Sequence, residues 1–251
     1  MINFFRRIRK QLADDNKPLK YMRYAIGEIV LVVIGILIAL QINNWNEERK
    51  DRIVEQQYLK GLQEEFELNG EQLHRFIKLN DELLEASTAL LQYTGPKATS
   101  IGVPKMGQLL GNIMGSSVGY ESNPGVLEDL INSGNLNKLT NSDLRKVLSL
   151  WKADLTKSKV QEIKILKYRD NITDIFIKLG PLRNMLQDTL RIGNSAFEIN
   201  TDLLLQEVQL ENNLTYFMIT SKALKYKHYA NLEKDVLMIL DLISKELKIT
   251  E

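Results

Sequence analysis

The sequence contains no cysteine and only two histidines. The absence of thiolates excludes disulfide bonds, cysteine nucleophiles and cysteine-based zinc sites. Glu71 and His74 have the Glu-x-x-His spacing of carboxylate-bridged di-metal bundles, but such a site needs a second pair. Lys225 stands where the glutamate of that second pair would precede His228. We therefore expect no metal ion and no other cofactor.

Proline and glycine are also scarce, at 5 and 14 of 251 residues. The glycines are scattered, so neither a phosphate-binding loop nor a dinucleotide-binding turn is evident, and no serine lies in a Gly-x-Ser-x-Gly elbow. We therefore do not expect an enzyme, although an enzyme of unrecognised type stays an alternative. Leucine, isoleucine, lysine, glutamate and asparagine dominate, which favours an all-α fold.

The net charge of +1 conceals an uneven distribution. Residues 1–24 contain seven basic and two acidic side chains, whereas the rest of the chain has an excess of four acidic ones. A basic segment beside an apolar one favours contact with the anionic inner leaflet of a lipid bilayer and a cytoplasmic N-terminus. A nucleic acid is not an expected partner, because no basic surface with interleaved aromatic residues follows.

The longest apolar run, AIGEIVLVVIGILIALQI, covers residues 25–42. As a helix it would span about 27 Å, close to one hydrocarbon core. Its apolarity around the full circumference argues against a buried core helix, and the lack of a small-residue cleavage site favours a signal anchor over a cleaved signal peptide. We predict a basic, amphipathic cytoplasmic segment 1–23, a transmembrane helix 24–42 and an extracytoplasmic helical domain 43–251.

Four residues near the ends of this helix suit the membrane interfaces: Arg23, Tyr24, Glu28 and Trp45. Glu28 lies one helical turn after Tyr24, so its carboxylate can reach the lipid head groups. Interfacial anchoring is therefore favoured over intramembrane proton chemistry.

One face of the predicted transmembrane helix carries Gly27, Leu31, Gly35 and Ala39 at every fourth position. The pair Gly35-x-x-x-Ala39 would let two such helices approach closely. A homodimer is therefore a candidate assembly.

Apolar residues spaced three to four apart predict three long helices, over residues 43–93, 141–179 and 209–248. The first is expected to continue from the membrane helix without a break. Long amphipathic helices must bury their apolar stripes against one another, which predicts an elongated antiparallel helical bundle. A short helix is expected near residues 104–113, and the Gly/Ser-rich stretch 115–122 is a candidate binding loop.

Polar residues before the remaining helices suggest their first turns. Asn123 is expected to cap a helix with Pro124 at its first position. Thr140, with Asp143 three residues on, resembles a capping box, and Thr201 is expected to cap a short helix. The aromatic residues Trp151, Tyr120 and Tyr216 could line a pocket but are more typical of a core at helical spacing.

The motif YAIGEIVLVVIGILIALQINNWNEERKDR resembles the membrane signature of an uncharacterised family, a domain of unknown function, from Bacteroidota-type bacteria. The later stretch NPGVLEDLINSGNLNKLTNSDLRKVLSL resembles a second block of that family. The resemblance covers most of the chain and implies an inner-membrane protein with a periplasmic helical domain. It implies no activity, ligand or catalytic residue.

Three hypotheses for function remain. The first is a membrane-anchored periplasmic module that binds an unknown envelope protein partner, or a second copy, without catalysis. The second is a periplasmic ligand sensor, which would need a separate partner to relay its signal because the segment before the apolar run is short. The third is the enzyme of unrecognised type.

Overall fold

The computed structural model describes residues 18–97, 101–115, 117–198 and 200–248. Its elements are α2 (Pro18–Leu91), α3 (Val103–Gly115), α4 (Gly125–Asn132), the 3₁₀ helix η1 (Asn135–Lys138), α5 (Ser142–Leu179), α6 (Leu182–Met185), α7 (Gln187–Leu190), α8 (Thr201–Leu205), α9 (Val208–Ala223), the π-helix η2 (Leu224–Tyr229) and α10 (Ala230–Lys248). The described residues contain no strand, so the all-α prediction is confirmed.

The chain divides into two compact units, residues 1–56 and 57–251. In the first unit, the described residues 18–56 belong to helix α2. This part of α2 holds an 18-residue window with a mean hydropathy of 2.6, of which no residue is buried. By length and composition the helix could therefore cross a membrane. Most of the predicted cytoplasmic segment, residues 1–17, lies outside the described residues.

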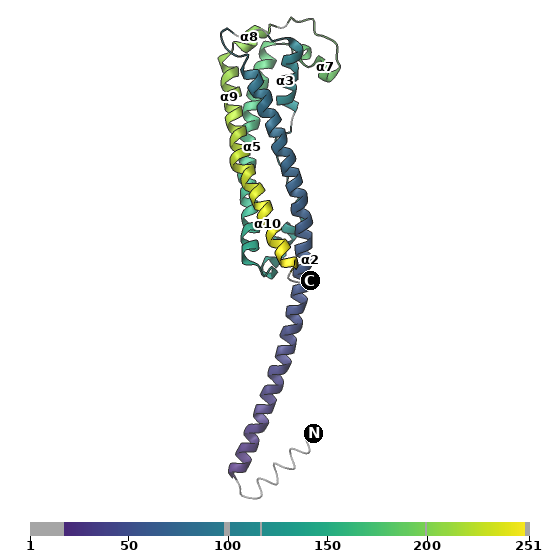
Figure 1. Ribbon diagram of the computed structural model, residues 1–251, viewed down its shortest axis with the longest axis vertical. Helices are drawn as coiled ribbons and strands as arrows, with labels where there is room; N and C mark the ends of the chain where they lie inside the picture. Colours follow the sequence, from purple (N-terminus) through teal and green to yellow (C-terminus); the bar gives the residue numbers. More distant parts are fainter. Residues whose placement is uncertain (1–17, 98–100, 116, 199, 249–251) are drawn as a thin grey trace. The chain divides into compact units, whose positions relative to one another are not determined.

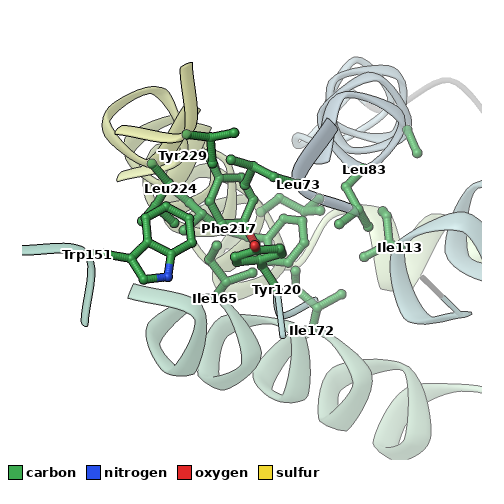
Figure 2. Packing of buried hydrophobic residues seen from close by; sticks show 14 of the residues in the cluster. Leu73, Leu83, Ile113, Tyr120, Trp151, Ile165, Ile172, Phe217, Leu224 and Tyr229 are labelled. Carbon is green, nitrogen blue, oxygen red and sulfur yellow. The ribbon is translucent and has the colours of Figure 1, made fainter. Parts of the chain in front are cut away.

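The second unit contains the whole hydrophobic core. The stripe on α2 predicted from helical spacing is buried, including Leu62, Phe66 and Leu73. Figure 2 shows side chains of α2, α5, α9 and η2 converging on this core. Trp151 packs edge-on against Phe66, with ring centroids 5.2 Å apart. The stripes are buried because each helix covers another, as the sequence predicts.

Helices α5 and α9 lie side by side, as do α5 and α10 (Figure 1). The pairs Gly70 with Val236 and Asp81 with Lys225 put α2 antiparallel to η2 and α10. Helices α2 and α5 run in the same direction, because the chain between them returns along α2. Val126 at the start of α4 lies against Gly61, far back from the end of α2.

The first turn of α4 differs from its prediction. The helix begins at Gly125, and Pro124 precedes it without a side-chain cap, so the expected Asn123 cap is wrong. The backbone N–H groups of Val126 and Leu127 instead donate to Oε2 of Glu65, at 2.5 and 3.4 Å. A carboxylate from another helix satisfies the free N–H groups and complements the positive end of the α4 dipole.

At two other helices the N-cap is the residue next to the predicted one. Asn141, not Thr140, caps α5, and its Oδ1 accepts the N–H of Leu144 at 2.9 Å. Asn200, not Thr201, caps α8. Asparagine is a strong N-cap residue because its short side chain reaches the N–H groups of the first turn.

The predicted helix 209–248 is interrupted by the π-helix η2. In the turn before η2, side-chain amides from two other helices donate to consecutive backbone carbonyls. Asn80 on α2 donates to the carbonyl of Ser221, and Gln161 on α5 to that of Thr220, both at 2.9 Å. Side chains that interrupt the backbone hydrogen bonds of an α-helix are a recognised cause of local departures from α-helical geometry.

Candidate functional site

A groove of about 780 Å³ runs between α2 and α10. We call it the α2–α10 groove; its lining residues are Glu67, Gly70, Glu71, Leu73, His74, Arg75, Glu233, Val236, Leu237 and Leu240. The lining positions on both helices recur at i, i+3 or i+4, and i+7, so the groove extends over two helical turns, about 10 Å.

The floor of the groove is apolar. Leu73 and Val236 are almost completely buried, whereas Leu237 is 64% exposed at the side. Gly70 permits the close approach of the two helices, because a Cβ atom there would lie only 3.1 Å from Cγ1 of Val236. Leu237 therefore extends the apolar surface of the floor to the exposed edge of the groove.

The rim of the groove is mostly acidic. Three acidic residues, Glu67, Glu71 and Glu233, line it together with Arg75 and His74, and all five are exposed. Glu67 accepts a hydrogen bond from Gln63 at 3.0 Å. Within the part of the chain that the structure describes, the side-chain carboxylates of Glu71 and Glu233 form no salt bridge or hydrogen bond, so both can meet a cation from outside.

A buried hydrogen-bond network lies in the core next to the groove. Glu162 on α5 accepts the Tyr229 hydroxyl at 2.9 Å and the Tyr120 backbone N–H at 3.0 Å. The Tyr120 hydroxyl donates to the Asn69 carbonyl at 3.2 Å, one residue before Gly70. Figure 2 shows the Tyr120 and Tyr229 rings within the same cluster. The network therefore connects α2, the 117–124 segment, α5 and η2.

Ionisation of the two tyrosines in this network is suppressed. Burial raises the pKa of both tyrosines, and the carboxylates of Glu65 and Glu162 add to the effect at Tyr120 and Tyr229 respectively. Burial also raises the pKa of Glu65, against the lowering effect of the Val126 and Leu127 N–H groups. Oε1 of Glu65 is buried and has no hydrogen-bond partner. The tyrosines therefore act here as neutral donors.

A second cluster of titratable side chains lies where α5 packs against η2 and α10. Burial, and then the nearby carboxylate of Asp154, raises the pKa of Asp235. Asp154 is paired with Lys157 at 2.6 Å. Burial lowers the pKa of His228, and the positive charges of Lys227, among others, add to the effect. In the part of the chain that the structure describes, no three side chains of a metal-binding type are grouped to hold an ion.

The sequence-predicted membrane residues lie on the exposed surface of the first unit. Leu31 is exposed, and a Cβ atom at Gly27 or Gly35 would meet no atom within 4 Å. Ala39 is likewise exposed on this face. The face is therefore open along the helix.

The predicted interface anchors differ from one another in exposure. Arg23 and Trp45 are exposed, whereas Glu28 is half-buried and makes an interaction within the structure. Tyr24 lies in α2, but its side chain is outside the described residues.

A family model matches residues 28–157, more than half of the chain. The chain belongs to the family of unknown function DUF6090. The matched residues of this DUF6090 protein cover α2 from Glu28, then α3, α4, η1 and the beginning of α5. Neither a curated protein nor a solved structure matches the chain.

Only part of the candidate site can be predicted from the sequence. The spacing of Glu71 and His74 is that of half a metal motif, whereas in the structure both residues lie at the rim of the groove. Trp151 and Tyr120 are core residues as predicted, whereas Tyr216 is 53% exposed and stacks on Tyr168. The 117–124 segment packs inward through Tyr120, which its glycine and serine content did not indicate.

Proposed function

We propose that this DUF6090 protein is a single-pass protein of a bacterial inner membrane whose helical domain binds a partner in the periplasm without catalysing a reaction. One observation carries the proposal. A window of 18 residues with a mean hydropathy of 2.6 has no buried residue. Burial in a lipid bilayer removes such an apolar surface from water, which is the main favourable contribution to insertion.

The distribution of charge supports the orientation. Seven basic residues precede the apolar window within residues 1–24, and those that follow it are mixed with acidic ones. Lysine and arginine close to a membrane helix accumulate on the cytoplasmic side, so the domain after the window belongs in the periplasm. Trp45, exposed just beyond the window, suits the periplasmic interface.

The α2–α10 groove supports the partner-binding part of the proposal. It combines an apolar floor with an exposed leucine and charged residues at its edge, which is the composition of a protein contact surface. Leu237 is the side chain best placed to enter a partner, because it lines the groove and is 64% exposed.

Anchoring and orientation can be tested in living bacteria with two fusions. We expect green fluorescent protein fused to the N-terminus to fluoresce and alkaline phosphatase fused to the C-terminus to be active. The protein should also stay with the membranes during extraction with alkaline carbonate. Release by carbonate, or a report of the same compartment from both ends, would refute the membrane-anchored topology.

Partner binding can be tested with a photocrosslinking residue at position 237. We expect a crosslinked adduct in membranes, with Val160 as the control, because Val160 is 52% exposed on α5 and does not line the groove. Absence of any adduct at position 237, or equal adducts at both positions, would count against binding through the groove.

A further inference from the structure

We propose that the α2–α10 groove binds a cationic amphipathic helix of a partner protein, an inference that rests on the partner-binding function proposed above. The shape of the groove suits a helix. Its lining follows helical spacing on two antiparallel helices and extends over about 10 Å, or two turns. A third helix with apolar residues at i and i+3 or i+4 matches such a groove.

The floor supplies the apolar contact. Leu73 and Val236 close the bottom of the groove, and Leu237 and Leu240 on α10 stand beside it. Gly70 has no side chain, so Val236 packs directly against the backbone of α2 and closes the floor. Apolar side chains of a partner helix would be removed from water here, which favours binding in proportion to the area buried.

The rim determines the charge of the partner. Glu67, Glu71 and Glu233 outnumber the single Arg75. Neither Glu71 nor Glu233 is paired with a cation among the described residues. Lysine or arginine on the edges of a docked helix would supply the missing countercharges, and an acidic helix would be repelled.

The same charges argue against a second copy of this chain as the occupant. Two such grooves facing one another would bring carboxylates together at the rim, and like charges in an interface disfavour association. An anionic lipid head group or another anionic ligand is disfavoured as well, because the carboxylates of the rim would repel it.

The experiment compares two labelled peptides of 14 residues with the same leucine face. One has lysine at every polar position and the other has glutamate. Binding is measured by fluorescence anisotropy to the full-length protein in phosphatidylcholine nanodiscs, with empty nanodiscs as the blank. We expect the lysine peptide to bind at least tenfold more tightly than the glutamate peptide at low ionic strength, with the difference reduced by added salt.

Variants of exposed residues link this preference to the groove. E71Q/E233Q should abolish most of the preference for lysine, whereas E82Q/E85Q, which changes two exposed glutamates outside the groove, should leave it intact. L237D should weaken binding of both peptides. Because all five side chains are exposed, none of these changes removes a core contact. Equal affinity for the two peptides, or an unchanged preference in E71Q/E233Q, would overturn the proposal.

The remaining outcomes separate this inference from the proposed function. If neither peptide binds but a crosslinker at position 237 traps a different protein whose adduct disappears in E71Q/E233Q, the cationic partner is supported. If the trapped protein is a second copy of this chain, the cationic partner is refuted while partner binding stands. If neither peptide binds and nothing is trapped, both proposals fail.

Discussion

Glu162 and Tyr229 form a hydrogen bond of 2.9 Å between side chains that are both largely excluded from water. The same carboxylate also receives the N–H of Tyr120, so two segments far apart in sequence depend on one acidic side chain. A buried carboxylate is stable only while such donors surround it. Individual residues of this kind therefore contribute to the position of the π-helix η2 against α5.

Replacing Tyr229 by phenylalanine removes one of these donors without changing the ring. We expect the free energy of unfolding to fall by about 1.5–3 kcal/mol, because hydrogen bonds to charged groups contribute that much and the carboxylate would lose a partner. Urea denaturation followed by circular dichroism measures the change. The control is Tyr226→Phe in the same π-helix, where the side chain is 68% exposed and little effect is expected. Equal losses in both variants would contradict a role for the buried bond.

Asp235 predicts a pH dependence of stability. Its pKa is raised in the folded state, so the folded protein binds the proton more tightly than the unfolded chain does. The stability linked to this group is therefore greatest below the unfolded pKa of about 3.9, and it is lost as pH rises through the higher folded pKa.

Asp235→Asn should remove that loss. We expect the variant to gain stability relative to the original protein as pH rises from about 4 towards neutrality. Chemical denaturation at a series of pH values measures the difference. Asp174→Asn, at an exposed position of α5, serves as the control and should give no such trend. A difference between Asp235→Asn and the original protein that does not change with pH would rule out the assigned titration.

At the scale of the elements, the long helices could be predicted together with their ends, whereas the first turn of α4 and the π-helix η2 could not. The spacing of Leu62, Phe66 and Leu73 predicts the buried face of α2, because the helical repeat is a local property of the chain. The start of α4 instead depends on Glu65, which comes from a helix about sixty residues earlier. The π-helix η2 likewise receives Asn80 and Gln161 from two other helices in its preceding turn, so local sequence contains little sign of it.

The contact between α3 and α6 gives a prediction at this scale. A Cβ atom at Gly107 would collide with the backbone oxygen of Met185, so any side chain there would force α3 or α6 to move. We expect Gly107→Ala to lower the free energy of unfolding by about 1–3 kcal/mol, as overpacking commonly does. Gly115→Ala in the same helix is the control, because its Cβ would meet nothing within 4 Å. Thermal unfolding of the two variants compares them, and an unchanged stability of Gly107→Ala would show that α6 adapts freely.

At the scale of the whole molecule, the chain separates into two units with different chemical character. Residues 57–251 contain the entire hydrophobic core, whereas the apolar window before them has no buried residue. The sequence alone indicates this division, because a continuous apolar run and an amphipathic repeat differ in composition. By length and composition this apolar window could cross a membrane.

Cysteine crosslinking tests for the second copy directly, since the chain has no cysteine of its own. We expect Ala39→Cys, on the Gly27–Gly35 face, to form a disulfide-linked dimer in oxidised membranes more readily than Val33→Cys on the opposite face. Non-reducing gel electrophoresis measures the fraction of dimer. Equal crosslinking at the two positions would contradict packing through the small-residue face.

The sequence by itself determined the class of the fold, the positions of the long helices and the apolar segment, because these follow from composition and from repeats within a few residues. Only the tertiary structure decided that Glu65 caps α4, that Tyr120 and Tyr229 meet at Glu162, and that Gly70 and Val236 form the base of a groove. Each of these contacts joins segments distant in the chain. Their geometry depends on how the helices are placed against one another, which no local pattern contains.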